Sequence, residues 1–110
     1  MAVHHQLSQV LDDLEEALKT SQLWQVETPD QAAMLSQQPF CVDTMSLPQW
    51  LRFVFIQRLQ ALADTGGVMP AKCEVAPAVM VYLQQENFGS SDQQRVVKAV
   101  ERVDYLVTQS

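Results

Sequence analysis

The feature that most constrains the fold is the stretch of residues 46–67, SLPQWLRFVFIQRLQALADTGG, the longest apolar segment with helical spacing in the chain. Ser46, followed three residues later by Gln49, predicts a capping box, and Pro48 lies in the first turn, where a missing amide costs nothing. Gly66 and Gly67 supply the backbone freedom with which helices end. The segment therefore predicts a central helix of about five turns.

An uninterrupted α-helix over this segment places a wide apolar arc on one side. The arc consists of Leu47, Trp50, Leu51, Val54, Phe55, Leu59 and Leu62. Trp50 heads the arc and is expected to be largely buried against the first and third helices, because its ring offers more burial than any neighbour. Phe53 and Ile56 fall on the polar side of the same projection.

Arg58 breaks the pattern, because the projection places it in the middle of the apolar arc. A buried charge without a partner is strongly unfavourable. We therefore predict that Arg58 points inward and binds Asp43 through two parallel hydrogen bonds, with Thr44 adding another. These three residues are the first candidate site. They form either a structural latch that holds residues 38–45 on the central helix, which we favour, or part of a ligand or partner site.

Three further helices are predicted by apolar spacing and caps. Residues 3–20 are amphipathic, residues 76–85 are too continuously apolar for a surface helix, and a fourth helix begins at Ser90 or Ser91. The core face of the fourth helix consists of Val96, Ala99, Val100, Val103 and Val107. No segment alternates as a strand does. The expected fold is therefore all-α, a four-helix bundle formed by residues 1–110 as a single domain.

The connection between the first two helices, residues 21–45, is longer than usual and is expected to be an ordered crossover. Thr28, Pro29 and Gln31 predict a short helix that extends to Leu35. Residues 40–45 are expected to be extended and partly buried. A loop is expected at residues 68–74.

Charge restricts the function. The chain has 13 acidic and 7 basic residues and a net charge of −6, so strong non-specific binding of nucleic acid is not expected. The second candidate site is a basic strip on the fourth helix, Arg95, Lys98 and Arg102. Pairing with the acidic first helix or solvation is the favoured interpretation of this strip, and a protein partner or RNA is the alternative.

The sequence predicts no catalytic residue, metal or cofactor. It contains no phosphate-binding glycine loop, nucleophile elbow or metal-binding helix motif. Cys41 and Cys73 are expected to be free thiols. The first residues do not resemble a secretion signal, and no apolar run approaches the roughly 20 residues that span a bilayer, so a cytoplasmic location is expected.

Several motifs together carry a family resemblance: QPFCVDTM at residues 38–45, WL at 50–51, IQRL at 56–59 and VAP at 75–77. With these motifs the chain resembles the YqcC-like family of small bacterial proteins over nearly its whole length. The resemblance implies a four-helix bundle. It also implies a link to tRNA pseudouridine synthase C, because the genes of the family lie beside the gene of that enzyme.

Synthases of that class use the aspartate of an Arg-Leu-Asp motif in a much larger mixed α/β domain. Here only Arg102-Val103-Asp104 is similar, and Asp104 is expected to be ordinary helix surface. We therefore expect a non-enzymatic accessory protein that binds a protein partner, with a tRNA-modifying enzyme as the candidate. The alternative is a domain that binds or transforms a small molecule or tRNA directly.

Overall fold

The computed structural model describes residues 2–68 and 73–109, and this part of the chain is helical without strands. The all-α class predicted from the sequence is confirmed. The predicted loop at 68–74 lies largely outside the described residues. In chain order the elements are α1 (Ala2–Thr20), the 3₁₀ helices η1 (Ala33–Leu35) and η2 (Pro39–Cys41), α2 (Leu47–Trp50), the π-helical turn η3 (Leu51–Phe55), α3 (Ile56–Thr65), α4 (Ala76–Gln85) and α5 (Ser90–Gln109).

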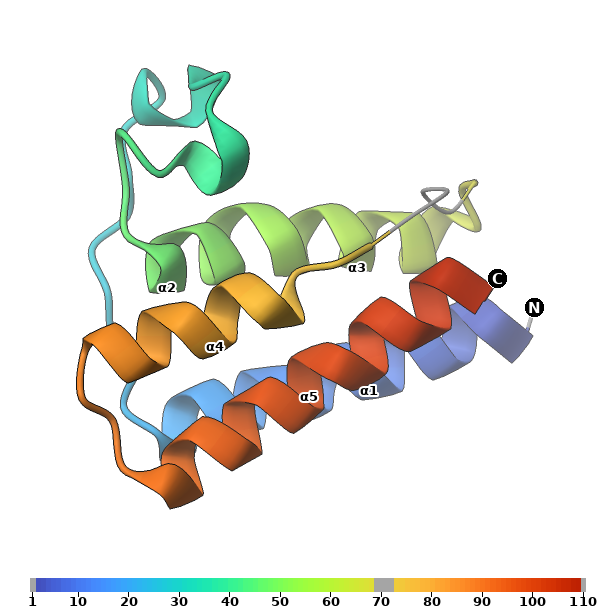
Figure 1. The fold of residues 1–110 in the computed structure, drawn as a ribbon. Helices are drawn as coiled ribbons and strands as arrows, with labels where there is room; N and C mark the ends of the chain where they lie inside the picture. The colour runs from blue at the N-terminus through green and yellow to red at the C-terminus, as the bar shows by residue number, and fades with distance from the viewer. Residues whose placement is uncertain (1, 69–72, 110) are drawn as a thin grey trace.

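The long helices pack around one apolar core. Helix α1 lies antiparallel to α5 and also packs against α3, while α4 packs on α5 (Figure 1). The side chains with less than 2% exposure are Leu7, Leu11, Leu14, Leu18, Leu51, Val79, Leu83, Val96, Val100, Val103 and Val107. The core face predicted for the fourth helix is therefore confirmed.

Both predicted ends of the central helix are confirmed. The Ser46 side chain accepts a hydrogen bond from the Gln49 amide, and the Gln49 side chain accepts one from the Ser46 amide, which completes the capping box. Gly66 ends the helix in the left-handed conformation, with φ of 69°, a conformation that side chains with a Cβ disfavour. Local rules thus fix where this helix begins and ends.

The helix is interrupted by a π-helical turn that the sequence analysis did not anticipate. The amide of Ile56 donates to the carbonyl of Leu51, a π-type hydrogen bond that adds one residue to the turn. Each residue after the turn therefore points where the preceding residue would point in an uninterrupted helix. This shift is a rotation of roughly 100° around the helix axis. Ile56, 6% exposed, faces the core as a result, and Leu59, 4% exposed, stays on the core side.

This change of register makes the predicted Arg58 latch wrong. Leu59 occupies the inward direction that the projection gave to Arg58, and Arg58 points away from the core. Arg58 is exposed and forms no hydrogen bond or ion pair with any residue in the ranges 2–68 and 73–109. The inward placement expected for this guanidinium is corrected, and so is the polar placement expected for Ile56.

Arg58→Lys is accordingly expected to change the free energy of unfolding by less than about 0.5 kcal/mol, the usual range for a surface substitution without a specific contact. Urea melts of the two proteins measure the difference. A loss above about 1.5 kcal/mol would mean that the guanidinium has a specific partner after all.

The segment between α1 and α2 differs in detail from its prediction. The short helix expected from Thr28 to Leu35 is reduced to a turn and η1, where the Asp30 carboxylate accepts from the Ala33 amide at 2.8 Å. Residues 40–45 are folded into tight turns instead of extended. Phe40 and Cys41 have positive φ angles of 58° and 50°, and the amide of Met45 donates to the Cys41 carbonyl.

Trp50 is partly buried, with most of its side chain covered, as the sequence predicted. Its ring stacks on Phe55, with centroids 5.3 Å apart, and meets Phe40 edge-on at 5.0 Å. It packs against the main core and also against a small cluster formed by Cys41, Met45 and Val54. Trp50 therefore joins the two clusters. The folded turns of residues 39–45 place Phe40 against the same ring.

Candidate functional site

We call the folded segment of residues 21–46 the crossover lobe; its turns stand above α2 in Figure 1. Asp43 and Thr44, two members of the first candidate site, have their hydrogen bonds within this lobe. The Ser36 hydroxyl donates to the Asp43 carboxylate, and the Thr44 hydroxyl donates to the Ala33 carbonyl at 2.8 Å. Their polar groups stabilise the turns, and the structure does not bring them together with Arg58.

Arg52 is one of the residues that attach the lobe to the central helix. Its Nη1 donates to the Trp24 carbonyl at 2.6 Å. The guanidinium also lies over the Trp24 ring, 4.4 Å from its centroid, and 5.0 Å from the Phe53 centroid. No sequence signal pairs residue 24 with residue 52, because the contact depends on how the lobe folds back.

Arg52→Lys is expected to lower the free energy of unfolding by about 1–2 kcal/mol, since an ammonium loses the planar stacking on Trp24 and the directed hydrogen bond. Arg58→Lys is the matched control, because it makes the same chemical change on the same helix at an exposed site that has no partner among the described residues. Equal stabilities of the two variants in urea melts would contradict the attachment.

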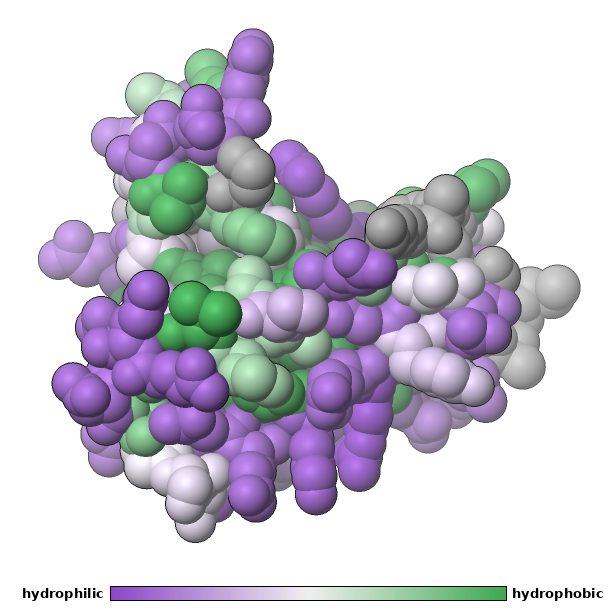
Figure 2. All heavy atoms as spheres, viewed as in Figure 1, coloured by the Kyte–Doolittle hydropathy of each residue, from purple (hydrophilic) through white to green (hydrophobic). Residues whose placement is uncertain are grey.

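The lobe and α4 form the walls of an apolar cleft of about 290 Å³. Phe40, Val42, Met45, Ser46 and Leu47 line it from the lobe and the start of α2, and Ala78, Val81, Tyr82 and Gln85 line it from α4. In Figure 2 apolar side chains gather on this face between the lobe and α4. Its chemistry suits apolar side chains, since it contains no charged lining residue.

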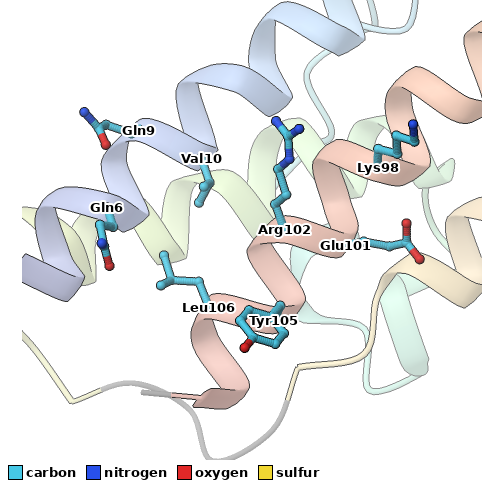
Figure 3. A pocket seen from close by; sticks show the side chains of 8 residues that line it. All are labelled: Gln6, Gln9, Val10, Lys98, Glu101, Arg102, Tyr105 and Leu106. Atoms are coloured by element: carbon cyan, nitrogen blue, oxygen red, sulfur yellow. The ribbon is translucent and has the colours of Figure 1, made fainter.

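The basic strip lies along the groove between α1 and α5. Arg95 is engaged in a 2.6 Å ion pair with Asp92, and its Nη1 also donates to the Ser21 hydroxyl at 3.3 Å. Lys98 and Arg102 are exposed. Both line an open pocket of about 630 Å³, which is also lined by Gln6, Gln9, Val10, Glu101, Tyr105 and Leu106. Figure 3 shows Lys98 and Arg102 projecting from α5 beside these side chains.

Acidic side chains share this groove with the strip. The adjoining pocket, about 420 Å³, is lined by Asp13 and Glu16 of α1 together with all three basic residues. No ion pair between the two helices is found within residues 2–68 and 73–109. The mixed charges weaken the groove as a site for phosphates, because affinity for nucleic acid comes mainly from uncompensated cations.

Asp104 has a structural role that its sequence context did not reveal. Its carboxylate accepts hydrogen bonds from the amides of Val75 and Ala76, at 2.9 and 2.7 Å, and thereby caps the start of α4. It also accepts from the Cys73 thiol at 3.0 Å. Burial, followed by this hydrogen bond and the Asp104 charge, raises the pKa of Cys73 to about 12. Asp104 is thus more than the helix surface that we expected.

The described residues offer no cluster for a metal ion: no three His, Cys, Asp or Glu side chains in this part of the chain converge as ligands do. Cys41 is buried and Cys73 is half-buried, and both are free thiols. None of the described helices combines the length and the apolar character needed to cross a membrane.

Comparison with protein families gives a match over residues 6–106 to the family described as tRNA pseudouridine synthase C. An uncharacterized protein of Haemophilus influenzae is 36% identical over 85 residues, which are 77% of this chain and 80% of that protein. The uncharacterized protein YqcC of Escherichia coli is 35% identical over 77 residues, 70% of this chain and 71% of YqcC.

A third relative differs in length. A Pectobacterium carotovorum protein named tRNA pseudouridine synthase C is 41% identical over 70 residues, 64% of this chain but only 19% of that protein. Among solved structures, the solution NMR structure of YqcC from E. coli matches with a TM-score of 0.81 and 29% identity, over 98% of this chain and 90% of YqcC. The helical fold agrees with that structure.

Proposed function

The chain belongs to the YqcC-like family, described as tRNA pseudouridine synthase C, and from this membership we propose that it is an accessory protein that binds a tRNA pseudouridine synthase. In this proposal the bound enzyme forms pseudouridine and the chain supplies a binding surface. The family resemblance noted in the sequence leads to the same partner.

One observation carries the proposal. In the Pectobacterium relative, the segment that resembles this chain occupies only 19% of a protein named tRNA pseudouridine synthase C. Most of that protein therefore lies outside the resemblance. Covalent linkage of two modules gives them an effective concentration of the order of millimolar, which is a means of keeping interacting modules together. A separate chain of this family would bring the same two modules together by binding the synthase non-covalently.

The surfaces of the chain favour a protein partner over RNA. The apolar cleft between the lobe and α4 suits apolar side chains, whereas RNA presents a charged backbone. Of the basic strip, Arg95 is already paired with Asp92, and Asp13, Glu16 and Glu101 lie in the same pockets as Lys98 and Arg102. Two cations among carboxylates bind phosphates weakly at physiological salt.

Two assays on the purified chain separate this proposal from direct action on tRNA. We expect no pseudouridine formation by the chain alone, and a tRNA gel shift that is weak at about 50 mM salt and lost at about 200 mM. Titration calorimetry with the tRNA pseudouridine synthase of the same bacterium should show saturable binding. Turnover by the chain alone, or the absence of binding to the synthase, would contradict the proposal.

We propose further that the long helices form a four-helix bundle with residues 21–45 as its crossover, acting as a single domain in the cytoplasm. The likeness to the YqcC structure over 98% of this chain supports the bundle. The attachment of Trp24 by Arg52 supports the crossover as part of the same unit. Limited proteolysis should leave residues 21–45 uncut until the core unfolds, and preferential cutting there would contradict an ordered crossover.

A further inference from the structure

Helix α4 has an apolar face that the rest of the described chain does not cover. Its sequence is too continuously apolar for a surface helix, yet Met80 is 42% and Val81 51% exposed. Across the apolar cleft, Val42 of the lobe is 70% exposed. From its sequence this helix was expected to be covered; the exposure corrects that prediction and leaves an apolar face available for a partner.

The cleft has the size and form of a docking groove for side chains. Its volume of about 290 Å³ lies just below the roughly 300–1,000 Å³ that small-molecule pockets occupy. One wall is the helix α4, of 10 residues, so a partner helix can pack along it with anchors at spacings of three and four. The cleft therefore suits a few apolar side chains from one face of a helix.

On each wall of the cleft an acidic residue follows a lining residue in the sequence. Asp43 follows Val42 on the lobe, and Glu86 follows Gln85 at the end of α4; both are exposed. Burial, with the Glu86 charge second, raises the pKa of Tyr82, which lines the cleft. Within residues 2–68 and 73–109, neither carboxylate forms an ion pair, and no Lys or Arg lines the cleft. The complementary ligand is thus apolar in the middle and basic at its edges.

We propose that the apolar cleft binds a basic amphipathic helix of the tRNA pseudouridine synthase. Its apolar side chains enter the cleft between Val42 and Val81, and its Lys or Arg side chains lie beside Asp43 and Glu86. The inference rests on the proposed function for the identity of the partner. The chemistry of the helix follows from the cleft, and the net charge of −6 favours a basic partner at longer range.

The test is titration calorimetry of the full chain and three variants against the purified synthase of the same bacterium. Val42→Lys and Val81→Lys place a cation in the cleft, and each is expected to weaken binding at least about tenfold. Tyr105→Lys is the matched control, because it adds the same charge at a side chain that is 69% exposed on the other groove. It should weaken binding less than about threefold, which is less than 1 kcal/mol.

All three side chains are largely exposed, so thermal melts of the variants should match the parent and exclude misfolding. If the parent binds and the cleft variants bind equally well, the cleft is not the binding site, and the proposed function stands. If the parent does not bind the synthase, both fail. If sedimentation shows that the chain dimerises and that Val81→Lys abolishes the dimer, the occupant is a second copy and the basic helix is wrong.

Discussion

Trp50→Ala is expected to lower the free energy of unfolding by about 2–4 kcal/mol. Deleting a fully buried aromatic side chain costs about 3–5 kcal/mol, and the partial exposure of Trp50 reduces the transfer contribution. The ring contacts add to the expected loss of stability, because aromatic pairs contribute about 0.5–1.5 kcal/mol beyond their burial. Trp50 has two such contacts, with Phe55 at 5.3 Å and with Phe40 at 5.0 Å.

The matched control is Trp50→Phe, which retains a ring between Phe40 and Phe55 and should lose about 1 kcal/mol. Urea melts followed by circular dichroism measure both variants, since a second tryptophan, Trp24, complicates fluorescence. A loss below about 1 kcal/mol for Trp50→Ala would mean that this ring does not join the main core to the small cluster of Cys41, Met45 and Val54.

Asp104→Ala is expected to destabilise the fold by about 2 kcal/mol. The substitution leaves the amides of Val75 and Ala76 without their acceptor, and hydrogen bonds to a charged group contribute about 1.5–3 kcal/mol. A lost N-terminal cap alone costs about 0.5–2 kcal/mol. Asp12→Ala on the exposed face of α1 is the control and should stay within about 0.5 kcal/mol of the parent. Equal losses for the two variants would contradict the cap.

A second measurement on Asp104→Ala reports the local contact directly. The pKa of Cys73 is about 12 because of burial and then of the Asp104 hydrogen bond and charge. Removing the carboxylate should lower that pKa and increase the thiolate fraction at pH 8, so iodoacetamide should modify Cys73 faster than in the parent. Cys41→Ser in both proteins makes the reaction specific. An unchanged rate would show that the carboxylate does not affect the thiol.

Much of the helical structure follows from local sequence rules. The capping box of Ser46 and the left-handed Gly66 are local devices, and the predicted limits of α4 agree with the structure. The core face of α5 was predicted because its valines recur at helical spacing. Such features depend on residues a few positions apart, so they can be predicted from the sequence alone.

The candidate site was predicted less well, for two physical reasons. The π-type hydrogen bond between Ile56 and Leu51 rotates the second half of the central helix, and a projection with constant α-helical geometry cannot include such a rotation. The contacts of Arg52 with Trp24 and of Asp104 with Val75 join segments distant in sequence. They depend on how the chain folds back, and no spacing rule connects them.

The measurement that tests the central claim most directly is an NMR titration of the ¹⁵N-labelled chain with the unlabelled synthase of the same bacterium. We predict that amide signals of residues 40–47 and 78–86 shift or broaden, because these segments border the apolar cleft, while those lining the groove between α1 and α5 change little. Perturbations concentrated at Lys98, Arg102 and Tyr105, or none at all on saturation, would contradict the account.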